Sequence, residues 1–324
     1  MSVFSSESPT IAAMSEIELH RKLLGDAGRN QAFHAALKQV ITPGVTTVAD
    51  LGAGTGFLSF LARRLGAKHC HLVEYSEALA LAQTLARANG ITGLQFTHAH
   101  SGEIANPPRV DLVISETLGN YALEEGLLET LVDARRYLKP GGAIMPCRLQ
   151  QFVAPVSDPS LQREIDLWST VGFDLNLDAA RVVSLNNLYV RRVPPTHLAA
   201  PGACWDDLDF SPKSPPPLSR RQQKVSFAPA PHTVHGLALW WVCTLAPGVD
   251  ISTAPDAAPT HWDQVYLPLL EAITLQQGDA LQVTLTSDTR PDVGLRLQWR
   301  VTHQRAGKRI SEQSLDSFRG RLQA

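Results

Sequence analysis

The sequence predicts an α/β protein in which a doubly wound parallel sheet is followed by a mostly antiparallel β domain. In the first half, short apolar runs alternate with helical patterns, which is typical of a parallel sheet covered by helices. A glycine-rich turn at 52–56 directly follows the first apolar run. In the second half, apolar and polar residues alternate with a period of two from Leu295 to Thr302, which predicts half-buried antiparallel strands.

The individual elements follow from these patterns. In the first half we expect helices at 16–40, 57–65, 77–89 and 125–138, and strands at 45–51, 70–74, 94–97 and 110–115. The pattern changes after Lys139-Pro-Gly-Gly142, which places a domain boundary between residues 147 and 148. Beyond it, strands are expected at 237–246, 281–285 and 295–302, in a sandwich or barrel. The proline-rich segment 211–217 and the basic pair Arg220 and Arg221 are expected in loops.

Composition excludes several classes of protein. The chain has 324 residues, 44% of them hydrophobic, and a net charge of -2, which predicts two globular domains and no basic nucleic-acid track. No apolar run approaches the ~20 residues of a membrane span, and residues 1–18 lack the features of a secretory signal. The four cysteines are scattered, which predicts reduced thiols in the cytoplasm and no metal site.

The segment 48–56, Val-Ala-Asp-Leu-Gly-Ala-Gly-Thr-Gly, predicts a nucleotide-type cradle. Its alternating glycines match neither a dinucleotide fingerprint nor a phosphate loop. The next predicted strand ends at Glu74, 24 residues after Asp50, where an acid of a doubly wound fold commonly meets ribose hydroxyls. With these features the chain resembles a class I S-adenosylmethionine-dependent methyltransferase. An ordinary glycine turn is the alternative interpretation.

Two acids follow the strand 110–115. Glu116 lies at its end, and Glu125 comes nine residues later, so that a hairpin in the intervening loop brings them together. Two carboxylates without metal-ligand partners suit a guanidinium, whose planar donors they bind in a bidentate manner. The alternative is a loop carboxylate at Glu116, with Glu124 and Glu125 on a solvated helix face.

Three segments resemble motifs of the protein arginine methyltransferases, in the family's order and over residues 16–302. Residues 116–125 resemble the double-glutamate loop, 259–264 (Pro-Thr-His-Trp-Asp-Gln) the threonine-histidine-tryptophan loop, and 20–30 the helix that closes over the cofactor. The chain is thus similar to a divergent member of this family. The resemblance implies a Rossmann-like methyltransferase domain followed by a β-barrel.

The resemblance also implies the cofactor, S-adenosyl-L-methionine, and roles for individual residues. Arg29 would hold the cofactor carboxylate, Glu74 would accept from the ribose hydroxyls, and adenine would lie near 101–103. The residues expected to bind the cofactor are His20, Arg29, Asp50, Gly52, Gly54, Gly56, Glu74, Gly102 and Glu103, the last two being alternatives because the match there requires a gap. The expected catalytic residues are Glu116 and Glu125, which would clamp the substrate guanidinium, and His261 with Asp26, which would join the two domains.

Each of these residues also has a structural interpretation. Arg29 fits an ordinary surface position of a helix, His20 and His261 fit core or loop positions, and Asp26 fits a helix cap. Trp262 is expected to pack rather than to take part in chemistry.

The chain also departs from the family pattern in places. The aromatic signature expected before His20 is absent from 10–15, Thr117 stands where the family has tryptophan, and Asn120 where it has tyrosine.

Three functions therefore remain open. The first is methylation of arginine in a protein or peptide, the second is methylation of another amine, amidine or hydroxyl on a small molecule, and the third is a non-catalytic cofactor-binding scaffold. No nucleic-acid or membrane partner is expected. Residues 187–205 occupy the place of the family's dimerisation arm, so we expect a homodimer; a disordered surface loop is the alternative.

Overall fold

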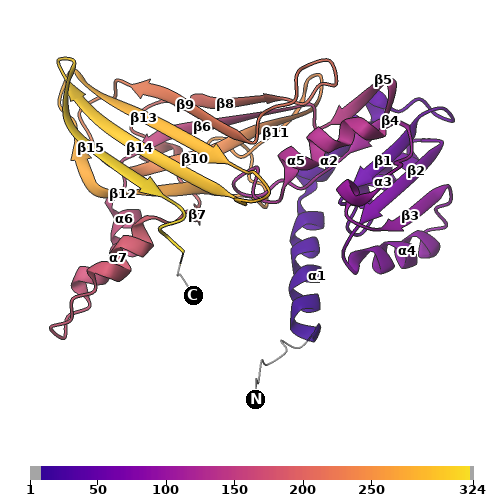
Figure 1. Ribbon diagram of the computed structural model, residues 1–324, viewed down its shortest axis with the longest axis horizontal. Helices are drawn as coiled ribbons and strands as arrows, with labels where there is room; N and C mark the ends of the chain where they lie inside the picture. Colours follow the sequence, from indigo (N-terminus) through magenta and orange to yellow (C-terminus); the bar gives the residue numbers. More distant parts are fainter. Residues whose placement is uncertain (1–8, 322–324) are drawn as a thin grey trace.

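A computed structural model describes residues 9–321 of the chain, in which a parallel α/β part and an elongated antiparallel β part lie side by side (Figure 1). Residues 1–8 and the side chains of 9–16 lie outside the described residues. The expectation that residues 1–18 form no secretory signal falls largely on this part of the chain. No helix within 9–321 combines the length and the apolar character needed to cross a bilayer.

The first part is a five-stranded parallel sheet with the strand order β3-β2-β1-β4-β5. Its strands are β1 (Thr47–Leu51), β2 (His69–Glu74), β3 (Leu94–His98), β4 (Val110–Ile114) and β5 (Leu138–Met145). The covering helices are α3 (Phe57–Arg64), α4 (Ala78–Ala88) and α5 (Leu127–Asp133), the last continued by a 3₁₀ turn (Ala134–Tyr137). The doubly wound fold is confirmed. Because the strand order reverses between β1 and β4, ligands of such a sheet bind beside the carboxyl ends of these two strands.

Strand β5 was not predicted. Its sequence contains Lys139-Pro-Gly-Gly142, which has the character of a turn, yet it pairs in parallel with β4. A register irregularity between Val110 and Leu112 accommodates this segment, and β5 is the last strand on its side of the sheet. Proline and glycine are tolerated at such an edge because no further ladder depends on them.

The single helix expected at 16–40 is two helices, α1 (Pro9–Gly25) and α2 (Ala27–Val40). Asp26 separates them in an extended conformation and caps α2, its carboxylate accepting the backbone N–H of Arg29 at 2.9 Å. The prediction of one continuous helix is therefore wrong, because an N-cap residue must leave helical geometry. Helix α1 extends away from the rest of the molecule (Figure 1).

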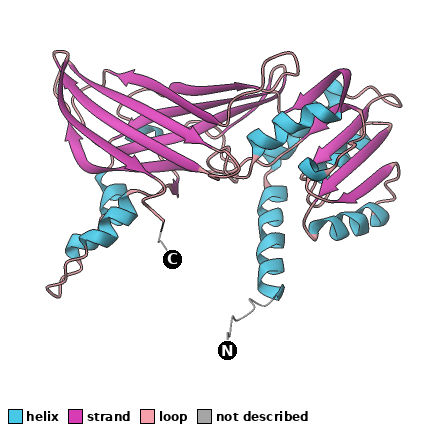
Figure 2. Cartoon of the chain, viewed as in Figure 1, coloured by secondary structure: helices cyan, strands magenta, loops and turns pink. Residues whose placement is uncertain are grey.

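The second part consists of two antiparallel sheets, which cover one another in Figure 2. One has the order β7-β12-β10-β6-β8, with β11 beside β10; the other has the order β15-β14-β13-β9. The strands of the first sheet are β6 (Arg148–Val156), β7 (Tyr189–Arg191), β8 (Ala203–Asp209), β10 (Thr233–Ala246), β11 (Val249–Ser252) and β12 (Gln264–Thr274). Those of the second are β9 (Arg220–Phe227), β13 (Asp279–Asp288), β14 (Arg296–Arg305) and β15 (Lys308–Asp316).

Side chains rather than a continuous ladder join the edges of the two sheets within the described residues. At one edge, Arg221 of β9 donates to Asp206 of β8 at 3.0 Å. At the other, the Gln313 side chain of β15 exchanges two hydrogen bonds with the backbone of Glu271 in β12. The expected barrel is thus two facing sheets closed by polar side chains. Arg220 and Arg221 lie in β9, so the expected loop is wrong. The expected solvation is wrong for Arg221, which is largely buried, whereas the Arg220 side chain is exposed.

A helical projection, residues 159–185, was also not predicted. It contains α6 (Pro159–Ile165), a 3₁₀ turn (Trp168–Thr170) and α7 (Asp178–Leu185), and it extends from the β part (Figures 1 and 2). The expected arm at 187–205 lies instead against the sheet, where β7 pairs with β12 and Leu198 forms a bridge with Val156. The dipeptide Asp158-Pro159 is an N-cap followed by a first-turn proline, a signal that marks the start of α6.

The packing of β10 on β12 gives a test of the core. A Cβ atom at Gly236 would lie 2.3 Å from Cζ of the fully buried Tyr266 ring. We expect Gly236→Ala to lower the free energy of unfolding by about 1–3 kcal/mol, because overpacking forces a buried ring or its strand to move. Urea unfolding followed by circular dichroism measures this change. Gly25→Ala, where a Cβ meets nothing within 4 Å, is the matched control and should unfold like the parent protein.

Candidate active site

The glycine turn after β1 lies at the carboxyl end of the sheet. Gly52, Gly54 and Gly56 have φ values of 74°, 51° and 78°, which L-residues rarely adopt. A Cβ atom at Gly54 would lie 2.6 Å from Cε1 of His20, which means that α1 places this imidazole directly against the turn. Gly56 forms the N-cap of α3, so that the first amides of the helix face the same region.

Two acids support this turn in different ways. Glu74, at the end of β2, is buried and accepts the backbone N–H groups of Gly54 at 2.9 Å and Ser76 at 2.8 Å. Asp50 is also buried, but it binds the hydroxyl and the amide of Ser59 in α3. Burial raises the pKa of Asp50 to about 6, although the hydrogen bonds from Ser59 favour its charged form. Asp50 therefore anchors α3 to β1, and its contact with the cofactor stays a prediction.

The segment expected near adenine forms a 3₁₀ turn, Ser101–Glu103. The carbonyl of Ser101 accepts from the Tyr137 hydroxyl at 2.7 Å, and the Gly102 amide donates to Nδ1 of His100 at 3.3 Å. Glu103 is exposed. Both Gly102 and Glu103 face the solvent-accessible side of the turn, so the choice between them as the adenine contact stays open.

Arg29 and Glu116 form a buried ion pair between α2 and the loop after β4. Nε of Arg29 donates to Oε2 of Glu116 at 3.0 Å, a terminal nitrogen of the same guanidinium donates to the same oxygen, and both side chains are 3% exposed. The surface interpretation of Arg29 is therefore wrong. The second terminal nitrogen donates to Asn30, which accounts for three of the five guanidinium N–H groups and leaves two for a further acceptor.

Glu124 and Glu125 differ in their surroundings. Oε1 of Glu124 accepts the backbone N–H of Asn120 at 2.7 Å and so closes the loop on itself. Glu125 is exposed, and no hydrogen bond joins its carboxylate to another described residue. Neighbouring protein still restricts its hydration, and this effect, together with the charges of Glu116 and Glu124, raises the pKa of Glu125 to about 7.

The pair of Asp26 and His261 joins the two parts of the chain. Oδ2 of Asp26 lies 2.9 Å from both Nδ1 and the backbone N of His261, while Oδ1 accepts the Arg29 amide. Burial opposes ionisation of Asp26, but the bonds from Arg29 and His261 outweigh it and hold the pKa of Asp26 below its usual range. Asp26 is thus both the helix cap and the expected partner of His261. The His261 ring also packs on Trp262, with ring centroids 3.8 Å apart.

The loop from Glu116 to Glu125 is held by residues of the β part. The indole N–H of Trp262 donates to the carbonyl of Leu118 at 2.8 Å, and that of Trp241 donates to the carbonyl of Gly119 at 3.1 Å. The two indoles meet edge to face, 5.0 Å apart. Trp262 packs as expected, but it also positions the acidic loop. The role of Trp241 was not predicted, because the apolar run 237–246 indicates only a buried strand.

A second buried contact fixes the same loop. The hydroxyl of Tyr121 donates to Oγ of Ser287 at 2.8 Å, and a terminal nitrogen of Arg221 donates to that oxygen at 3.3 Å. Arg221 in turn pairs with Asp206, which also accepts from Gln151 at 2.9 Å. This chain of hydrogen bonds connects the acidic loop to strands on both sheets of the β part.

The residues present fit S-adenosylmethionine. The three glycines have no side chain that would keep a ligand away from the backbone of the turn. Each carboxylate oxygen of Glu74 accepts one backbone N–H and has a second lone pair that can accept from a ribose hydroxyl. The buried Oγ1 of Thr117 has no hydrogen-bond partner among the described residues, and the Thr117 methyl group lies against Gly52. A buried hydroxyl without a partner indicates a polar ligand at this position. The described residues include no group of three or more histidine, cysteine or acidic side chains that could hold a metal ion.

Comparison with known proteins identifies the family. Residues 148–304 match the arginine methyltransferase oligomerization subdomain, and residues 44–174 match a methyltransferase domain. The chain is 31% identical to protein arginine N-methyltransferase 6 of Xenopus tropicalis over 294 residues, which cover 86% of each protein. It is 30% identical to protein arginine N-methyltransferase 1 of Dictyostelium discoideum, over 86% of this chain and 83% of the relative. The chain belongs to the protein arginine N-methyltransferase family.

Solved structures agree on the fold. The enzyme–prozyme heterotetrameric complex of Trypanosoma brucei PRMT1 with AdoHcy superposes with a TM-score of 0.81 at 21% identity, over 92% of this chain and 97% of that one. Protein arginine methyltransferase 10 of Arabidopsis thaliana gives a TM-score of 0.78 at 18% identity, over 92% and 97%. The methyltransferase domain match and the relatives in sequence show that the protein is an S-adenosylmethionine-dependent N-methyltransferase of this family, and the resemblance found in the sequence is confirmed.

The raised pKa of Glu125 predicts a pH dependence. Only the ionised carboxylate attracts a guanidinium, so kcat/KM for an arginine peptide should rise as the pH increases through about 7. Glu124→Gln removes one of the charges that raise this pKa while it keeps an oxygen acceptor for the Asn120 amide. The rising limb should therefore move to lower pH in this variant. A limb that stays in place would show that Glu124 does not influence the group that titrates.

Proposed function

We propose that the protein transfers a methyl group from S-adenosylmethionine to a guanidinium nitrogen of arginine in a protein or peptide, with Glu116 and Glu125 as the residues that hold the guanidinium. The observation that carries the assignment is the position of these acids. They lie on one loop that follows β4 at the switch point of the sheet, and Thr117 of this loop lies against Gly52 of the glycine turn.

The cofactor would lie along the turn formed by 52–56. His20 packs against Gly54 and would cover the cofactor from α1, while Glu74 would accept from its ribose hydroxyls. Arg29 has two N–H groups left for the cofactor carboxylate while it remains paired with Glu116. This arrangement supports a role for Arg29 on both the cofactor and the substrate side of the site.

The two glutamates would share the substrate unequally. Oε2 of Glu116 already accepts two N–H groups from Arg29, whereas Oε1 accepts only the Leu118 amide, at 3.3 Å. Glu116 therefore offers one oxygen, and Glu125 offers both of its own. A guanidinium held at two corners by three carboxylate oxygens has its third nitrogen free to attack, and its orientation is fixed.

The protein's share of the chemistry is orientation and charge. When bound, S-adenosylmethionine supplies an activated methyl group on a positively charged sulfur. A free guanidinium has a pKa above about 12 and is not deprotonated by any side chain before the reaction. Glu116 and Glu125 concentrate its positive charge on the nitrogens they hold, which leaves electron density on the third. Methylation would make that nitrogen more acidic, and Glu125 or His261 would accept the proton that it loses.

A homodimer is part of the proposal, and its basis is the helical projection. Phe173 at the tip of the projection is 88% exposed and Leu175 is 64% exposed. The α/β part has an apolar depression of about 280 Å³, lined mainly by Leu24, Phe57, Phe60, Leu61, Leu85 and Ile91. The tip of one copy and the depression of another are complementary in apolar character. A cytoplasmic location is also proposed, and four cysteines without a disulfide support it.

Glu116→Gln tests the function. The variant should bind S-adenosylhomocysteine with little change in affinity and lose on the order of a hundredfold or more in kcat, because a preorganised charge at the reacting group is removed. Turnover with a labelled cofactor and an arginine peptide measures kcat, and calorimetry measures binding. The control is Glu271→Gln, the same change at a side chain that is 76% exposed. Near-normal turnover of the Glu116 variant would refute the clamp.

Labelled cofactor and a host lysate separate the remaining functions. Label that disappears from the macromolecular fraction after protease treatment supports a protein substrate. Label in small molecules supports the second function of the sequence analysis, and the absence of any transfer supports a scaffold.

Phe173→Asp tests the homodimer. In the dimer the new carboxylate would be buried against the apolar depression, which is unfavourable. Sedimentation equilibrium should therefore shift from dimer to monomer at micromolar concentration. Ile310→Asp, which places the same charge at an exposed position of β15, should leave the mass unchanged. A parent protein that sediments as a monomer would rule out the dimer.

A further inference from the structure

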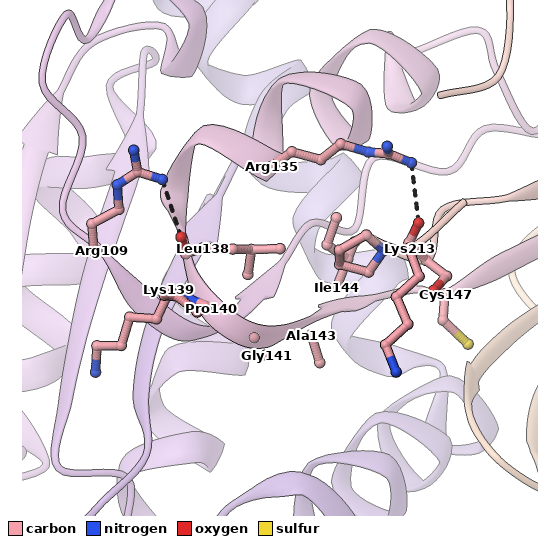
Figure 3. Close-up of a pocket in the computed structure, with 13 residues that line it drawn as sticks. Arg109, Arg135, Leu138, Lys139, Pro140, Gly141, Ala143, Ile144, Cys147 and Lys213 are labelled. Atoms are coloured by element: carbon pink, nitrogen blue, oxygen red, sulfur yellow. Dashed lines mark hydrogen bonds between the residues drawn. The ribbon is translucent and has the colours of Figure 1, made fainter. Parts of the chain in front are cut away.

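A groove of about 900 Å³ lies along β5, between this strand and residues 211–213 (Figure 3), and no residue of the acidic loop lines it. Its walls combine a strand edge with apolar and cationic side chains. The apolar part is formed mainly by Leu138, Pro140, Ala143, Ile144 and Pro212, and the cationic part by Arg109, Arg135, Lys139 and Lys213. None of the described residues that line the groove is acidic.

The positive charge of this groove is only partly neutralised. Lys139 pairs with Asp111 at 2.9 Å. Arg109 donates to the carbonyl of Leu138, and Arg135 donates to the carbonyls of Ser211 and Ser214, so these guanidinium groups contact neutral acceptors rather than carboxylates. Nε of Arg135 is buried and has no hydrogen-bond partner among the described residues. The groove therefore carries positive charge that an anionic ligand would neutralise.

The shape and lining of the groove favour a peptide over a nucleic acid. Strand β5 is the last of its sheet, but its register on β4 shifts between Leu138 and Ala143 and Pro140 has no N–H, so this edge does not offer a continuous ladder to an added strand. A ligand would therefore be held by the cationic and apolar side chains. The lining contains no aromatic side chain, and aromatic rings are the usual platforms for stacked nucleic-acid bases.

We propose that this groove binds an extended acidic segment of a partner protein, which places carboxylates against Arg109, Arg135 and Lys213. In an extended segment alternate side chains point to the same side, so one set of carboxylates meets the cations while the other faces solvent. Neither Glu116 nor Glu125 lines the groove, and peptide binding to it does not require methyl transfer.

The test uses a fluorescein-labelled peptide of about ten residues in which glutamate alternates with valine or threonine, at the upper end of usual strand lengths. Anisotropy with the full-length protein should show saturable binding that weakens at high salt. Replacement of every glutamate by glutamine should weaken binding at least tenfold, because this change removes the charge of the peptide and keeps its length.

The protein variants locate the site. Arg109→Glu combined with Lys213→Glu should weaken binding of the acidic peptide at least tenfold, since both side chains are exposed and line the groove. Lys38→Glu combined with Lys224→Glu makes the same change in net charge at exposed positions outside it and should have no effect. Equal loss in both pairs, no saturable binding, or a single-stranded oligonucleotide that binds more tightly than the peptide would each overturn the proposal. Turnover of a short arginine peptide should stay unchanged in both pairs, which separates this result from any failure of the proposed catalysis.

Discussion

The hydrogen bonds from two indoles to the acidic loop are the constraint on which the rest of the site depends. Trp262 and Trp241 belong to the β part, yet their N–H groups hold the carbonyls of Leu118 and Gly119 in the loop of the α/β part. A buried carbonyl without such a donor would be unfavourable, so the loop adopts this course only when the β part is in place. The site is therefore a joint product of both halves of the chain.

Charged side chains also connect the β part to the acidic loop. Asp26 ends α1, caps α2 and binds His261, and the cap fixes the start of the helix that carries Arg29. Arg29 then holds Glu116 within the protein, where an isolated charge of either sign would be costly. A short chain of buried polar contacts thus runs from the β part through α2 to the acidic loop.

Much of this architecture could be predicted from the sequence, because local patterns carry it. Period-two alternation marks β13 and β14, and the glycine turn with Glu74 marks the cofactor edge. Asp26 and His261, far apart in sequence, were paired only through the resemblance to a family. The sequence also contains Asp158-Pro159, an N-cap followed by a first-turn proline, from which the start of α6 could have been predicted.

Other features depend on tertiary contacts that no local pattern records. Residues 139–142 have the composition of a turn but lie in β5, because β4 supplies the pairing that the segment would lack alone. Arg221 has the character of a surface residue but is largely buried, because Asp206 lies opposite it on another strand. The hydrogen bond from the Trp241 indole could not be predicted either. The sequence of β10 indicates that this residue is buried but does not show that its N–H donates to the carbonyl of Gly119.

The most direct test of the account compares two neighbouring residues of β10. Trp241 donates to the acidic loop, whereas Trp240 stacks on Phe152 within the β part, with ring centroids 6.0 Å apart. The measurement is kcat of Trp241→Phe and Trp240→Phe with an arginine peptide, alongside the dissociation constant of S-adenosylhomocysteine. The account predicts that kcat falls at least tenfold in Trp241→Phe alone, with the cofactor affinity and the circular dichroism spectrum of both variants unchanged. Equal kcat values in two folded variants would contradict it.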